Sequence, residues 1–155
     1  MMPARAHHTG GFALIELLVV SVILGALALI GAAGFRNVVE QGRLESATHG
    51  LYTALTDARS AALAAEHGAP YGVQIEPERA VLFRGGEYDP LDPRNRSVEF
   101  SGITATAALD DGSSAVVFEK RTGRAAGSGT ITLLQEATQA STTLTVHPSG
   151  VVSAE

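Results

Sequence analysis

The chain contains no cysteine, so disulfide bonds, thiolate-bound metal ions and a cysteine nucleophile are all excluded. Positive charge is also scarce: 11 Lys and Arg stand against 16 Asp and Glu, for a formal net charge of -5. That balance argues against non-specific binding to nucleic acid or to anionic lipid headgroups. Apolar residues make up 45% of the 155 residues, which is enough for about one domain with a true core.

Catalytic motifs are missing as well. The sequence has no Gly-x-Ser-x-Gly, no phosphate-binding Walker loop and no His-Glu-x-x-His. His49, His67 and His147 lack the spacing of zinc ligands. We therefore expect no enzyme activity, no catalytic residues, no cofactor and no metal.

Two clusters of charged residues are candidate ion-binding sites. Glu87, Asp89 and Asp92 lie in the polar, Pro-rich segment 85–96, and their oxygens are of the kind that calcium prefers. Their spacing matches no calcium loop, so an exposed, solvated loop is the favoured interpretation. A basic cluster follows later, formed by Lys120, Arg121 and Arg124. It has no interleaved aromatic residues for base stacking, and a solvated turn is favoured over a phosphate site.

What the sequence does contain is one long apolar run. Residues 17–35 form a stretch of 19 without a charge. At about 1.5 Å per helical residue this stretch reaches roughly 28 Å, close to the hydrocarbon core of a bilayer, about 30 Å thick. We predict a single membrane helix. The short N-terminal segment before it carries Arg5 and no acid, and we place this segment on the cytoplasmic side. The same N-terminal segment also suits an ordinary secretory signal peptide, with Ala33 as its cleavage point.

The next segment, 36–67, is amphipathic. Apolar or small residues recur at the spacing of one helical face: Val39, Leu44, Ala47, Leu51, Ala54, Leu55, Ala58, Ala62 and Ala65. Gly68 and Pro70 provide a stop signal. The pattern predicts one helix from about Phe12 to about Glu66.

Beyond Pro70 the apolar period changes to two, which is typical of strands. The alternating stretches are YGVQIE, AVLFR, SVEFSG, ITATAAL, SAVVFEK, GTITLLQE, TTLTVHP and GVVSA, separated by turn signals such as DDG and PSG. The predicted fold class is α+β: a long N-terminal helix, half membrane-spanning and half amphipathic, packed on an antiparallel β-sheet or small β-sandwich head covering 71–155.

Glu16 stands inside the apolar run, and a carboxylate there indicates a function with a partner for its charge. The stretch GFALIELLVV resembles the processing signal of type IV prepilins and of type II secretion pseudopilins. The resemblance implies cleavage between Gly11 and Phe12 by a prepilin peptidase, N-methylation of Phe12, and a role for Glu16 in filament assembly. It also implies a leader over 1–11, a transmembrane and assembly helix over 12–35, and a soluble pilin-like head over 36–155.

A second match lies in the amphipathic segment. Its Leu-x-x-x-Leu-x-x-Ala-Arg-Ser-x-Ala spacing, from Leu51 to Ala62, resembles the GspH/FimT group of minor pseudopilins. VVFEKRTGR and LTVHPSGVVS resemble two late strands of that group, each ending at a turn glycine, here Gly123 and Gly150. The chain departs from relatives in having GAAG over 31–34 in place of a helix proline. It also lacks the C-terminal basic residues of relatives that bind DNA.

The combined expectation is a minor pseudopilin or pilin subunit, a structural protein that assembles through its N-terminal helix. Its partners would be other pilins, the prepilin peptidase and the assembly platform, and not nucleic acid. Its place would be the bacterial inner membrane, single-pass with a periplasmic head, and later the filament. This expectation covers a type II secretion system, a type IV pilus and a DNA-uptake pilus alike. The alternative is a secreted β-rich binding domain with an ordinary signal peptide.

Overall fold

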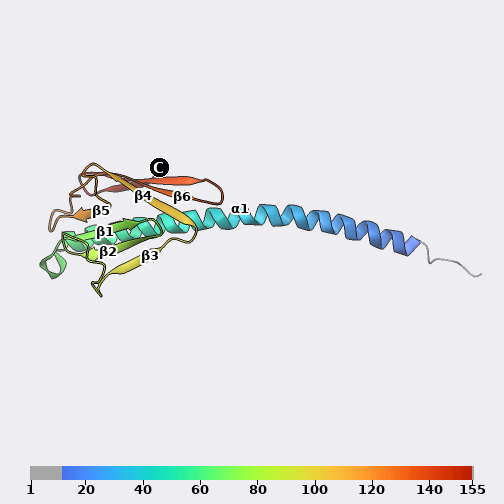
Figure 1. The fold of residues 1–155 in the computed structure, drawn as a ribbon, viewed down its shortest axis with the longest axis horizontal. Helices are drawn as coiled ribbons and strands as arrows, with labels where there is room; N and C mark the ends of the chain where they lie inside the picture. The colour runs from blue at the N-terminus through green and yellow to red at the C-terminus, as the bar shows by residue number, and fades with distance from the viewer. Residues whose placement is uncertain (1–11, 155) are drawn as a thin grey trace, which may run out of the picture. The chain divides into compact units, whose positions relative to one another are not determined.

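The computed structural model describes the backbone of residues 12–154 and the side chains of 14–29 and 39–154. The fold is α+β (Figure 1). Helix α1 covers Phe12–Leu63, and a short 3-10 helix, η1, covers Glu66–Gly68. Eight strands follow: β1 (Tyr71–Glu76), β2 (Arg79–Arg84), β3 (Arg96–Glu99), β4 (Ile103–Leu109), β5 (Ala115–Phe118), β6 (Gly129–Gln135), β7 (Ser141–Val146) and β8 (Val152–Ala154).

The chain divides between Val38 and Val39 into two units. The second unit, 39–155, holds the end of α1 and all the strands that the structure describes. Its strands form two four-stranded antiparallel sheets, sheet A with the order β3-β2-β1-β5 and sheet B with the order β4-β6-β7-β8. The prediction of an α+β chain with antiparallel strands is confirmed.

Sheet A is fixed by the β1–β2 hairpin, in which Tyr71 pairs with Arg84 and Glu76 with Arg79. Side chains alternate between the two faces of a strand. Tyr71, Val73 and Ile75 of β1 therefore share one face, and all three are buried in the common core. On the opposite face Phe83 is also buried, and its ring lies 5.5 Å from that of Tyr88.

Sheet B shows the same alternation more cleanly. Its inner face contributes Ile103, Ile131, Leu133, Leu144 and Val146 to the core, all of them almost fully buried. Threonines fill most of the outer positions, as in the cross-strand pair of Thr106 with Thr132. Threonine suits such positions because its branched side chain fits a half-exposed pleated surface.

The end of α1 completes this core. Leu51, Leu55, Ala58 and Ala62 are all 0% exposed. Their spacing of four, three and four residues places them on one stripe of the helix. Fully burying a leucine stabilises a fold by roughly 1.5–3 kcal/mol, so this stripe fixes the helix against the sheets.

One boundary prediction was wrong by a few residues. Helix α1 ends at Leu63 rather than near Glu66. The α-helical geometry is lost because Ala65 and His67 adopt left-handed backbone angles, with φ of 51° and 50°. Gly68 and Pro70, the predicted stop signal, then lead directly into β1 at Tyr71.

Within the part of the chain that the structure describes, no helix combines the length and the apolarity needed to cross a membrane. The span predicted for 12–35 includes residues 12, 13 and 30–35, whose side chains lie outside the described set. The predicted leader, 1–11, lies outside the described residues altogether, and Gly11 with it.

Candidate functional site

The side chains of residues 14–29 in helix α1 are all exposed. The large apolar ones are Leu14, Ile15, Leu17, Leu18, Val19, Val20, Val22, Ile23, Leu24, Leu27 and Leu29. The least exposed of these is Val20 at 47%, and the most exposed is Leu29 at 76%. An apolar surface of this extent indicates a binding site for lipid or for other protein chains.

Polar groups are nearly absent from this segment. The only charged side chain over 14–29 is Glu16, which is exposed. The hydroxyl of Ser21 donates to the carbonyl oxygen of Leu17 at 2.7 Å, so its hydrogen-bonding capacity is used inside the helix. Glu16 is therefore the one group here whose charge calls for a partner outside its own helix turn.

Phe12 is the first residue of α1, and Glu16 lies four residues later. Residues four apart occupy the same side of a helix, about 6 Å apart along its axis. An α-amino group created at Phe12 would thus lie on the same side of α1 as the carboxylate. The cleavage position itself, Gly11, lies outside the described residues.

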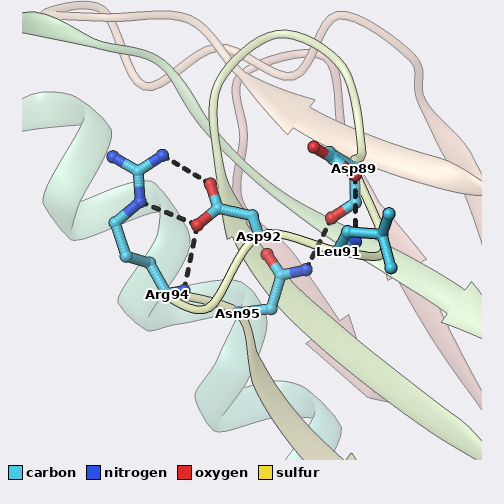
Figure 2. Close-up of polar contacts among 5 residues, drawn as sticks. All are labelled: Asp89, Leu91, Asp92, Arg94 and Asn95. Atoms are coloured by element: carbon cyan, nitrogen blue, oxygen red, sulfur yellow. Dashed lines mark hydrogen bonds and ion pairs between the residues drawn. The ribbon is translucent and has the colours of Figure 1, made fainter.

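The oxygen-rich loop 85–96 does not gather its carboxylates around a common point. In Figure 2, Asp92 accepts two bonds from the Arg94 guanidinium, at 2.7 and 2.6 Å, and one from the Arg94 backbone N–H at 2.9 Å. These bonds hold the pKa of the Asp92 carboxyl down at about 2. Asp89 instead accepts from the Leu91 backbone N–H at 2.9 Å. Among the described residues no three acidic or histidine side chains are placed to hold a metal ion.

Two residues of the basic cluster bond to helix ends, Lys120 through its side chain and Arg121 through its backbone, and sequence reasoning missed both contacts. The backbone N–H of Arg121 donates to the carbonyl oxygen of Ala62 at 2.8 Å, at the end of α1. The ammonium of Lys120 donates to the carbonyl oxygen of Gly68 at 3.0 Å, at the end of η1. The Gly68 carbonyl is one that a helix end leaves unpaired, whereas the Ala62 carbonyl also accepts from the Ala65 N–H at 3.0 Å. The sequence favours a solvated turn over a phosphate site, and no sequence signal points to these distant carbonyls.

The three histidines stay apart. His67 shares a hydrogen bond with the Tyr71 hydroxyl at 3.0 Å, and His147 with the Ser153 hydroxyl at 3.3 Å. His49 lies on α1 and is exposed. Each of the two bonded histidines serves a local contact next to the strands.

The motif residues from Leu51 to Ala62 and the two turn glycines do meet. Arg59 Nε donates to the Gly123 carbonyl oxygen at 3.3 Å. Gly150 packs so closely on that same carbonyl that a Cβ there would overlap it. The helix and two late turns are joined at this point.

Comparisons with family models, with curated proteins and with solved structures found no match to this chain.

Proposed function

We propose that the chain is a minor pseudopilin-like structural subunit, made as a precursor, processed between Gly11 and Phe12, and assembled into a filament through helix α1. The observation that supports this most is the exposed apolar segment over 14–29, with Glu16 as its one charge, four residues after Phe12. The head contributes a stable core and outer surfaces. In this proposal the head, 36–155, has a structural role and not a catalytic one.

The physical reasoning starts from the cost of exposure. Leaving a large aliphatic side chain in water forgoes roughly 1.5–3 kcal/mol, and eleven such side chains are exposed here. A bilayer removes this cost before assembly, and neighbouring apolar helices remove it afterwards. Either surrounding is poor in water, which raises the cost of any unpaired charge.

Glu16 then determines how copies fit together. Cleavage after Gly11 leaves an amine on Phe12, largely cationic at neutral pH because the model α-amino pKa is about 8. Pairing this amine with the Glu16 carboxylate of a neighbour offsets the burial cost of both charges. A neighbour displaced along the helix axis leaves the carboxylate unpaired, so Glu16 favours one register.

The experiment compares wild type with Glu16→Ala and Glu16→Gln in cells that form the filament. The amounts in membrane and in sheared filament fractions are measured. We expect membrane levels to be unchanged and filament incorporation to fall for both variants, since breaking a buried pair costs about 3–5 kcal/mol.

Ser21→Ala is the matched control. It alters a polar side chain in the same apolar segment, but one whose hydroxyl is bonded within its own helix. It should assemble as wild type does. Equal filament recovery of wild type and both Glu16 variants would contradict the assembly role.

A further inference from the structure

The two ends of sheet A carry opposite charge. Strand β2 ends at Arg84 and the antiparallel strand β3 begins at Arg96, so both arginines lie at the same end of the sheet. The other end holds Glu76, the last residue of β1, and Glu99, the last residue of β3. Glu78 lies in the turn between β1 and β2 at this same acidic end.

The basic end is hollowed into a cleft of about 480 Å³ between the sheet and the C-terminal turns of α1. Arg84, Arg94 and Arg96 form its sheet side. The register pairs Leu82 with Arg96, and Arg84 lies two residues beyond Leu82 on β2. The alternation of side chains therefore places Arg84 and Arg96 on one face of the sheet, and Arg94, in the turn before β3, lines the same cleft.

Of the three arginines, only Arg94 forms an ion pair with a described residue. Arg94 is bound by Asp92, with a closest N–O distance of 2.6 Å. Arg84 and Arg96 form no ion pair with any described residue. Asp57 and Glu66 line the helix side of the cleft and also form none. The sheet side thus presents two free guanidinium groups, which favour planar carboxylates because they can bind them with two parallel bonds.

The acidic end mirrors this arrangement. Arg79 is bound by Glu76 at 2.6 Å, and the carboxylates of Glu78 and Glu99 are left exposed and without an ion pair among the described residues. A hydrogen bond holds this turn against the end of β3: the N–H of Phe100 donates to the carbonyl oxygen of Glu78 at 2.7 Å. Such a turn loses little freedom on binding.

We propose that the arginine-lined cleft of one copy binds the acidic end of a second copy, so that heads associate head to tail. Two free arginines, Arg84 and Arg96, meet two free carboxylates, Glu78 and Glu99. The contact joins different surfaces of the two copies, so it leaves a free cleft and a free acidic end, and it can repeat. This inference rests on the proposed function, because a filament is the setting in which such a repeating contact is formed.

The test uses the full chain in lipid vesicles. Because the chain has no cysteine, a crosslinker that reacts with thiols joins only the cysteines that are introduced. One preparation carries Ser60→Cys at the cleft and the other carries Ser101→Cys, an exposed position two residues after Glu99. The two are mixed and treated with a bifunctional maleimide. Ser149→Cys, exposed in the turn between β7 and β8, replaces Ser101→Cys in the control mixture. We expect the first mixture to give about tenfold more heterodimer than the control, falling with added salt.

A charge swap makes the assignment specific. Arg84→Glu with Arg96→Glu on the Ser60→Cys chain should lower the yield to the control level, and so should Glu78→Arg with Glu99→Arg on the Ser101→Cys chain. Mixing the two reversed chains should restore it.

Folding is checked by tyrosine fluorescence. If the arginine variants do not fold, the exposed Glu78 and Glu99 changes decide alone. Equal yields with Ser101→Cys and Ser149→Cys, or no loss on reversing Glu78 and Glu99, would overturn the inference. Processing at Phe12 is read separately by mass, so the proposed function can fail independently.

Discussion

Arg59 Nε lies 3.3 Å from the carbonyl oxygen of Gly123, and this bond ties the buried stripe of α1 to the turn after β5. Gly150, from the turn between β7 and β8, packs against the same carbonyl group. Three segments far apart in the sequence thereby meet at one peptide. All three residues lie in stretches that resemble minor pseudopilins, and the resemblance does not imply that they are in contact.

Gly150→Ala should strongly destabilise the head. Its φ is +78°, and a Cβ would overlap the Gly123 carbonyl, so we expect a loss of about 3 kcal/mol. Gly112→Ala is the matched control, because its φ is +70° with nothing within 4 Å of the added carbon. It should lose only about 1 kcal/mol. Urea unfolding followed by the fluorescence of the three tyrosines, Tyr52, Tyr71 and Tyr88, measures both. Equal losses would show that Gly150 is not crowded.

Glu40 and Gln135 give a second stability test. Gln135 is 1% exposed, its amide nitrogen donates to the Glu40 carboxylate, and its Oε1 has no partner among the described residues. Glu40→Ala should cost about 1–3 kcal/mol, because it leaves the amide buried without its acceptor. Adding Gln135→Met should recover most of that loss. Additive losses in this double-mutant cycle, measured by urea unfolding, would contradict the pairing.

The acid response of the loop 85–96 follows from Asp92. Its pKa is lowered from 3.8 to about 2 by hydrogen bonds from Arg94. A lowered pKa means that the contact contributes fully above pH 3.8 and is lost as the pH falls toward 2. The carboxyl carbon of Asp92 should therefore titrate in NMR spectra near pH 2, and Arg94→Ala should move the midpoint up toward 3.8. A midpoint near 3.8 in the unaltered chain would show that the pair does not form.

The head should also fold without lipid. A chain of residues 36–155 keeps the buried stripe of α1 and both sheets, and it lacks the exposed apolar segment. We expect it to be monodisperse in buffer at moderate concentration and to show helix and strand together by circular dichroism. An aggregated product without a strand signal would mean that the apolar segment is part of the head's folding unit.

The sequence predicts the elements of this fold well and their assembly poorly. All eight strands were expected from period-two alternation, as in ITATAAL for β4, because alternation is a local property of a half-buried strand. The sequence left open whether the strands form one sheet or a sandwich, and the pairing of β1 with β5 could not be predicted because it joins residues distant in the chain. The role of Lys120 and Arg121 at the helix ends was missed for the same reason.

The candidate site could also be predicted only in part. The apolar segment and Glu16 can be recognised in the sequence, and the structure adds that the side chains over 14–29 are exposed. The complementary ends of sheet A were not predicted, because Arg84 and Arg96 come together only once β2 and β3 pair. Charged residues that are far apart in the sequence form a common surface only when the strand pairing places them side by side.

The most direct test of the proposed function is the intact mass of the chain after coexpression with a prepilin peptidase. The proposal predicts a mature protein that begins at Phe12 and carries one N-methyl group, and it predicts no cleavage when Gly11 is replaced by a bulky residue. A mature chain beginning at Gly34, after cleavage at Ala33, would contradict the proposal and identify an ordinary signal peptide.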